Sequence, residues 1–253
     1  MNNFLLLLKK EVWENWVNWK IPIILLAAVV CAILGTYMNY LSVKEYYSLA
    51  GYPYVLPATS MLLELYSNIT TFLILFAPFL VMGAVAGEIK NHNAAALLIK
   101  PVGRTGYILS KWLTYFLMFG IAVAITVFIG AIYANNLATD ANAFSNIKAL
   151  LATIGLFWVF IAFAVAVMIL LSTITNSQII AGILGLCVLM ACLYNPIGSI
   201  GELIPGRLLD WIKALLSNST TWQTNDWPAL WITVTIIVAS VFASIIIMKR
   251  KEL

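Results

Sequence analysis

Residues 88–111 read EIKNHNAAALLIKPVGRTGYILSK and separate two long apolar runs. The runs, 67–87 and 112–134, contain no Asp, Glu, Lys, Arg or His. A helix of about 20 apolar residues, rising 1.5 Å per residue, crosses the roughly 30 Å of hydrocarbon in a bilayer. Both runs are long enough for this, so the pattern predicts two transmembrane helices joined by a charged segment outside the lipid.

The chain as a whole has the same apolar character. Of its 253 residues, 63% are hydrophobic and only 9% are charged, and its mean hydropathy is +0.98. Soluble domains are about half apolar and roughly a quarter charged. We therefore predict an all-α integral membrane protein that forms a single transmembrane domain over residues 1–253. The six predicted transmembrane helices are 21–41, 67–87, 112–134, 149–171, 179–195 and 228–248.

Lysine and arginine are distributed unequally between the two sides of this topology. Ten of the fourteen lie in the N-terminal segment, in 88–111 and in the C-terminal tail. Because cytoplasmic loops carry an excess of basic residues, we predict that both termini and 88–111 are cytoplasmic, in a multi-pass protein of the plasma membrane. The predicted external connections are 42–66, 135–148 and 196–227. The net charge of +4 reflects this topology rather than a basic face, and we expect no nucleic-acid partner.

Residues 1–20 have the pattern of an amphipathic helix rather than of a span. Lys10 and Glu14 are opposite charges four residues apart, a spacing that places them side by side on a helix. Three tryptophans between positions 13 and 19, Trp16 among them, suit the lipid headgroup region. We predict a helix lying along the cytoplasmic membrane surface, in contact with lipid. The alternative, an extension of the first span, is disfavoured by the four charged residues between positions 9 and 14.

Residues 196–227, before the last predicted span, contain both chain-breaking residues and an apolar stripe. Prolines and glycines interrupt the first part, and apolar residues then recur at helical spacing between positions 208 and 216. One interpretation is a pair of short helices that re-enter the outer leaflet, where protein or a cavity must satisfy their backbone. The other is an amphipathic helix exposed on the outer surface.

The six predicted spans contain no Asp, Glu, Lys, Arg or His. Ion-coupled transporters and pumps need such groups inside the membrane, so this composition argues against these classes. The chain also lacks a GxxxxGK[ST] nucleotide motif, and its one histidine and three cysteines form no ligand cluster in the sequence. We predict that the chain is not itself an enzyme and has no catalytic, cofactor-binding or metal-binding residues.

The 88–111 segment divides at Pro101. Residues 94–99, AAALLI, are strong helix formers with an apolar patch, and the proline ends that helix. A short helix at the membrane face can bind in a groove of a cytoplasmic partner. The residues alone favour this docking role and a solvated re-entry loop equally.

The segment resembles that of the ABC-2 type permeases, the membrane subunits of one class of ATP-binding-cassette exporters. In that family the first cytoplasmic loop runs from a Glu, four residues before Gly-Thr, through a Leu run to Pro-Val-Ser-Arg and a Lys that opens the third span. The matching residues are Glu88, Leu97, Leu98, Pro101, Val102, Arg104 and Lys111. His92 and Asn93 stand in place of Gly-Thr, and Gly103 replaces the Ser.

The resemblance implies six transmembrane helices, an N-terminal amphipathic elbow helix and re-entrant half-helices before the last span. It also implies a dimer with a second permease copy or paralogue, docked on cytoplasmic ABC ATPase subunits that hold the ATP and Mg²⁺. The 88–111 segment is then the ATPase-coupling loop, with site residues Glu88, Ala94, Leu97, Leu98, Pro101, Val102 and Arg104. The elbow-helix residues that take part are Lys10, Glu14 and Trp16.

We therefore expect a permease subunit of an ATP-binding-cassette exporter, driven by ATP that a separate subunit hydrolyses. Expected substrates are an amphipathic peptide or antibiotic, a lipid-linked molecule or another substrate, and the charge-free spans favour an amphipathic one. The alternative function is a non-transporting membrane scaffold or sensor that recruits a cytoplasmic protein through 88–111. An intramembrane enzyme is disfavoured because the catalytic groups are missing.

Overall fold

The computed structural model describes residues 2–51, 56–90, 103–139, 147–175, 177–193, 205–217 and 227–251. These residues form helices joined by short turns, and no strand is present among them, which confirms the predicted all-α class for this part of the chain. In chain order the helices are α1 (Asn2–Val17), α2 (Lys20–Ala50), α3 (Ala58–Val81), α4 (Ala86–Lys90), α6 (Arg104–Leu137), α7 (Ile147–Ile174), α8 (Gln178–Leu193), α9 (Arg207–Leu216) and α10 (Trp227–Arg250).

Five helical stretches in the described residues are long and apolar enough to cross a membrane. They are α2, the stretch Ala58–Lys90 that holds α3 and α4, α6, α7 and α10. The apolar helix α8 has 16 residues, about 24 Å of helix against roughly 30 Å of hydrocarbon. The residues that follow it, 194–204, lie outside the described part of the chain, so the count of six spans stays a prediction.

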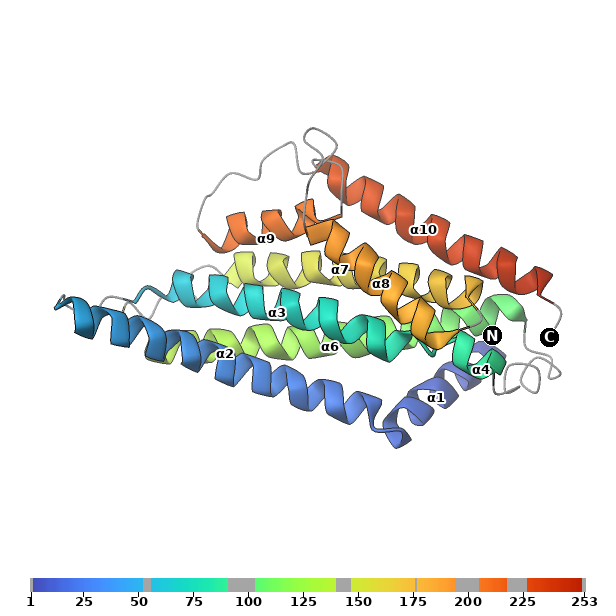
Figure 1. Ribbon diagram of the computed structural model, residues 1–253, viewed down its shortest axis with the longest axis horizontal. Helices are drawn as coiled ribbons and strands as arrows, with labels where there is room; N and C mark the ends of the chain where they lie inside the picture. Colours follow the sequence, from blue (N-terminus) through green and yellow to red (C-terminus); the bar gives the residue numbers. More distant parts are fainter. Residues whose placement is uncertain are drawn as a thin grey trace.

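The long helices run side by side along the longest axis of the molecule (Figure 1). The interior helix α7 packs against α3, α6, α8, α9 and α10. Its side chains Phe157, Phe160 and Ile161 are buried, as is Phe119 of α6. The outer helices, α2 and α10, bury few residues and expose mostly apolar side chains. An apolar exterior of this extent is typical of a surface that contacts lipid.

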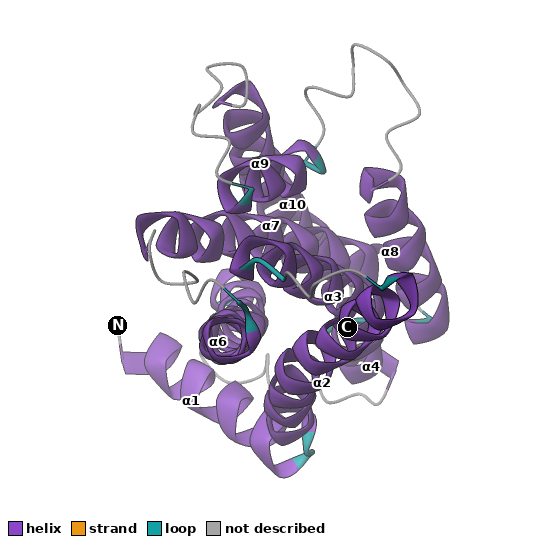
Figure 2. Cartoon of the chain, turned by 90° about the vertical axis from the view of Figure 1, so that its left-hand side faces the viewer, coloured by secondary structure: helices purple, strands orange, loops and turns teal. Residues whose placement is uncertain are grey.

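The N-terminal helix α1 runs across the direction of the long helices at one end of the bundle (Figure 1 and Figure 2). A turn at Asn18 and Trp19 separates it from α2. Trp19 has φ 61° and ψ 5°, a left-handed conformation that costs a non-glycine residue about 1–2 kcal/mol and prevents the two helices from continuing as one. On its bundle side α1 buries Leu7, Glu11 and Asn15, which are one turn apart, against α6 and α2.

The second apolar stretch is interrupted between α3 and α4, where residues 82–85 form a turn. The hydroxyl of Ser172, from α7, lies in this break. Its Oγ accepts hydrogen bonds from the backbone N–H groups of Val85 at 3.2 Å and Ala86 at 3.0 Å, and it donates to the carbonyl of Met82 at 2.9 Å. One side chain therefore satisfies three backbone groups that the break leaves without helical partners.

Within 196–227 the structure describes residues 205–217 and the first residue of α10. The apolar face of α9 packs against α7 and α3. Its buried side chains are Leu208, Leu209, Trp211, Ile212 and Leu216. Asp210 and Lys213 are exposed, with their charged atoms 3.6 Å apart. The apolar stripe is thus covered by protein rather than by water, and the re-entrant arrangement stays a prediction.

Candidate functional site

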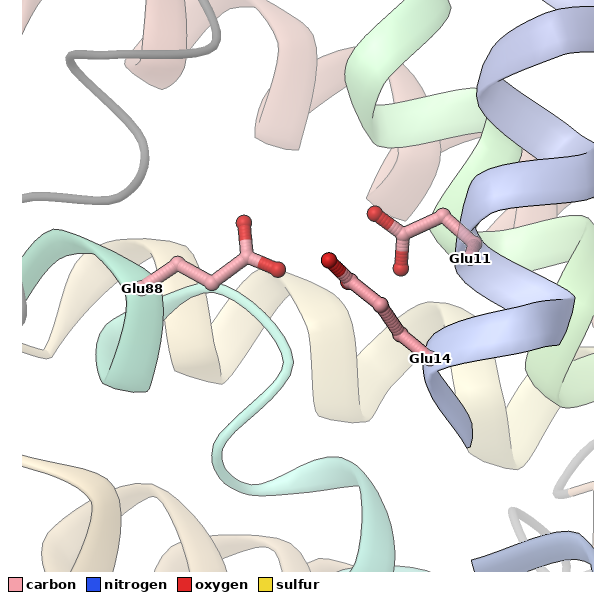
Figure 3. A group of neighbouring side chains, drawn as sticks. All are labelled: Glu11, Glu14 and Glu88. Carbon is pink, nitrogen blue, oxygen red and sulfur yellow. The ribbon is translucent and has the colours of Figure 1, made fainter. Parts of the chain in front are cut away.

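Charged side chains from α1, α4 and α6 meet at the end of the bundle where α1 lies. Glu11 and Glu14 of α1 and Glu88 of α4 point toward one another (Figure 3), and one oxygen of each lies within 4.8 Å of the others. Lys111 of α6 contacts two of these three acids. The site therefore joins the N-terminal helix to both ends of the 88–111 segment.

Lys111 holds the centre of this ion-pair network. Its Nζ donates to both oxygens of Glu11, at 3.1 Å each, and to Oε1 of Glu88 at 2.5 Å. The Lys111 and Glu11 side chains are only 2% and 3% exposed, and that of Glu88 is 18% exposed. A buried ammonium requires paired charges and hydrogen bonds to offset its lost hydration. The two carboxylates provide both.

Three polar side chains of α6, Tyr107, Lys111 and Tyr115, form a stripe with a spacing of one helical turn. The Tyr107 hydroxyl donates to Oε2 of Glu88 at 2.6 Å, so both oxygens of that carboxylate are bound. The ring of Tyr107 also lies 5.0 Å from the Lys111 ammonium, measured to the ring centroid, which suits a cation–π contact. Two successive turns of α6 thereby fix the position of Glu88.

Tyr115 extends the network to α2 and α3. Its hydroxyl accepts a hydrogen bond from Nζ of Lys20 at 3.1 Å, and the same ammonium lies 3.5 Å from the carbonyl oxygen of Leu80 near the end of α3. Lys20 is the first residue of α2. The first turn of α2 and the last turn of α3 are therefore tied to α6 beside the Lys111 cluster.

The three carboxylates form an ion-pair network rather than an open metal site. A cation such as Ca²⁺ is bound by carboxylate oxygens that point into one cavity. Here Glu11 and Glu88 are both bound to Lys111, and Glu14 pairs with Lys10 at 3.0 Å. Each of the three acids is thus already paired with an ammonium group of the chain itself.

Burial makes the charge of Glu11 depend on its partner. Loss of hydration raises the pKa of the Glu11 carboxyl above its ordinary value of 4.5, and the ammonium of Lys111 opposes that rise without cancelling it. The neighbouring carboxylate of Glu88 raises the pKa further. Without Lys111, the Glu11 carboxylate would be buried next to another negative charge.

Arg104 connects the 88–111 segment to the end of α10. It is the first residue of α6, and its Nη1 donates to the carbonyl oxygens of Met248 at 3.0 Å and Lys249 at 2.5 Å. These carbonyls belong to the last turn of α10, where backbone acceptors lack helical partners and a cation is favourable. The segment is thus connected to α1 through Lys111 and to α10 through Arg104.

The structure describes only some of the predicted site residues. Glu88 lies in the network and Arg104 contacts α10. On α1, Lys10 and Glu14 form an ion pair, and Trp16 is exposed. The remaining predicted residues, Ala94, Leu97, Leu98, Pro101 and Val102, lie outside the described residues, and their coupling role stays a prediction.

Sequence reasoning did not assign Glu11, Tyr107 or Lys20 to the site, and it placed Lys111 only at the opening of a span. A signal is present in α6, where Tyr107 and Lys111 are one helical turn apart at the edge of an apolar run. No local pattern pairs Glu11 with Lys111, because 100 residues separate them.

A family model described as ABC-2 family transporter protein matches residues 37–249, which is most of the chain. The match includes Glu88, Arg104 and Lys111, and it confirms the resemblance drawn from the 88–111 segment. Glu11 and the rest of α1 precede the matched residues. No curated protein matches the chain. With five helical stretches long and apolar enough to cross a membrane, the chain is an integral membrane protein that belongs to the ABC-2 transporter family.

Proposed function

We propose that this chain is the membrane-spanning permease subunit of an ATP-binding-cassette exporter, and that a separate cytoplasmic subunit hydrolyses the ATP. Membership of the ABC-2 family supports the transporter role and implies association with an ABC ATPase. In this proposal the chain supplies the path through the membrane, and the partner subunit holds ATP and Mg²⁺.

The observation that carries the proposal is the bridge that Lys111 forms between Glu11 and Glu88. Glu88 and Lys111 are the two ends of the proposed coupling loop. Because these ends are bonded to each other and to α1, a displacement of the loop by a partner would move α1, α4 and α6 together. The Arg104 contact would carry the same displacement to α10. Rigid-body movement of packed elements is one of the established forms of conformational switching.

Further features complete the proposal. The N-terminal helix α1 is the amphipathic elbow helix, both termini lie on the cytoplasmic face of the plasma membrane, and α8 belongs to the fifth of six spans. The 196–227 segment holds the re-entrant half-helices. Two permease chains, identical or paralogous, form the dimer.

An amphipathic substrate such as a peptide, an antibiotic or a lipid-linked molecule suits predicted spans that lack Asp, Glu, Lys, Arg and His.

Purification of the tagged chain from its native membranes in mild detergent tests this proposal. We expect an ATPase with a Walker motif to co-purify. Leu97→Asp places a carboxylate on the apolar patch of 94–99 and should abolish the association, because a central contact in an interface is typically worth about 2–4 kcal/mol. Leu49→Asp makes the same change at an exposed leucine at the far end of α2 and should leave the association unchanged.

The outcomes separate the possible roles of the chain. Recovery of no Walker-motif ATPase would contradict the permease proposal, and recovery of a kinase or regulator in its place would favour the scaffold or sensor. If the ATPase co-purifies equally with Leu97→Asp and with the wild type, the chain is a permease but residues 94–99 do not form the docking contact.

A further inference from the structure

One face of α1 is apolar, and no described part of the chain covers it. Leu6 and Trp13 are 65% and 67% exposed, and Leu5, Trp16 and Val17 are each more than half exposed. The opposite face of the helix carries the ion-pair network. Exposure of a continuous apolar surface to water is unfavourable. We therefore expect lipid or a ligand to cover this face of α1.

This apolar face contains a groove between successive turns of α1. The groove has a volume of about 320 Å³ and is lined by Lys9, Val12, Trp13 and Trp16. Three of the lining side chains are largely apolar, and the fourth carries an ammonium group. Such a lining fits a molecule that combines an apolar body with a negatively charged group.

Lys9 is the cation that can pair with the negatively charged group of such a molecule. It is exposed, and within the described part of the chain it forms no ion pair. The other nearby ammonium groups are engaged, because Lys10 is bound to Glu14 and Lys111 to Glu11. The positive charge of the groove is therefore directed outward rather than into the bundle.

We propose that this groove binds an anionic phospholipid from the membrane leaflet on which α1 lies. Lys9 pairs with the phosphate, while Trp13 and Trp16 pack against the glycerol and the upper acyl chains. Tryptophan suits this position because its ring is apolar and its indole N–H can reach a polar partner. This inference shares with the proposed function only the position of α1 at the membrane surface, and it requires no ATPase.

The lipid groove and the ion-pair network lie on opposite faces of the same helix. Glu11 falls between Lys9 and Trp13 in the sequence, but its side chain is buried against Lys111. A bound lipid would therefore hold in place the helix that carries Glu11. The amount of anionic lipid in the leaflet would then determine how firmly α1 is held.

An anionic lipid with brominated acyl chains tests the groove, because bromine quenches the fluorescence of a tryptophan that it contacts. The purified chain is reconstituted in phosphatidylcholine nanodiscs that contain a small fraction of brominated phosphatidylglycerol or, in a parallel sample, of brominated phosphatidylcholine. The excess quenching by the phosphatidylglycerol measures the preference for the anionic lipid. We expect this excess in the wild type and its loss in the double variant Trp13→Phe/Trp16→Phe, since these rings supply the signal.

Lys9→Gln should weaken the apparent affinity for brominated phosphatidylglycerol by about fivefold, the effect of one lysine at an anionic surface. Lys249→Gln removes the same charge from an exposed residue at the same end of the molecule and should leave the affinity unchanged. Equal quenching of the wild type by both lipids would overturn the proposal. An equal loss in the two lysine variants would also overturn it, because it would show general attraction of the membrane surface and no groove. Neither readout depends on an ATPase, so failure here is distinct from failure of the exporter function.

Discussion

Lys111 and Glu11 lie 100 residues apart in the sequence, yet the ammonium of the first donates to both carboxylate oxygens of the second at 3.1 Å. Both side chains are almost completely buried. Water cannot replace either partner at such a site, so breaking the pair costs more than breaking an ion pair on the surface. This contact fixes α1 against α6 at the point where the 88–111 segment returns to the bundle.

Lys111→Met should strongly destabilise the protein. The change keeps a long side chain but leaves Glu11 and Glu88 close together without their shared cation. We expect a loss of about 3–5 kcal/mol in the free energy of unfolding, measured by thermal or denaturant unfolding of the purified protein in detergent. The double variant Lys111→Met/Glu11→Gln should regain part of this loss, because only one carboxylate then remains without a counter-charge.

Lys213→Met provides the matched control for that experiment. Lys213 pairs with Asp210 at 3.6 Å, but both side chains are more than half exposed. An exposed pair typically contributes about 0–1 kcal/mol, so this variant should unfold close to the wild-type temperature. If Lys111→Met and Lys213→Met lower the free energy of unfolding equally, the buried network contributes no more to stability than an exposed ion pair does.

The stability of the protein should depend on pH through Glu11. The pKa of its carboxyl is raised above 4.5 by burial, so the folded protein holds this proton more tightly than the unfolded chain does. The resulting contribution to stability is fully present below pH 4.5 and is lost as the pH rises through the folded-state pKa. We expect the melting temperature of the wild type, relative to Glu11→Gln, to fall as the pH rises above 4.5. If the difference in melting temperature between the two proteins does not change with pH, Glu11 is not the source of the pH dependence.

Ser172→Ala should weaken the junction between α3 and α4. The variant removes the acceptor for the N–H groups of Val85 and Ala86, which are buried and have no helical partner there. We expect a destabilisation of about 1–3 kcal/mol, the usual cost of leaving buried polar groups unsatisfied. Ser42→Ala is the control, since the Ser42 hydroxyl bonds only within its own helix and is exposed. Its melting temperature should match that of the wild type.

The orientation of the chain can be checked with single cysteines in a background that lacks Cys31, Cys187 and Cys192. Thr105 and Lys148 are both exposed in the structure. The predicted topology places them on opposite sides of the membrane. A membrane-impermeant thiol reagent should label Lys148→Cys in intact cells and Thr105→Cys only after permeabilisation. Labelling of Thr105→Cys from outside would reverse the orientation and place the 88–111 segment on the wrong side for a cytoplasmic ATPase.

Hydrophobic pattern was sufficient to predict the helical class and the presence of several long apolar helices, because a bilayer imposes a length and a composition that the sequence must carry. It was less informative about where helices begin. The third predicted span opens at residue 112, whereas α6 begins at Arg104. An apolar run marks only the apolar part of a helix, and α6 also includes polar residues whose side chains have partners in the bundle. Tyr107 and Lys111 lie in that additional length and form the centre of the network.

Contacts between distant segments could not be predicted from local pattern at all. Ser172 lies almost 90 residues from the break that it satisfies, and nothing in the spacing of either segment indicates the other. The same holds for Arg104 and the end of α10, which are 144 residues apart. Such pairs depend on the packing of whole helices, and periodicity within one helix carries no information about its neighbours.

The order of the partners of Lys111 along the chain bears on how the protein is assembled in the membrane. Glu11 precedes Lys111 by 100 residues and Glu88 precedes it by 23, so the ribosome has made both acids before it makes the lysine. A buried ammonium without a paired charge is costly. Because both acids are made before Lys111, the nascent chain already holds the counter-charges of its own buried cation when α6 packs against the bundle.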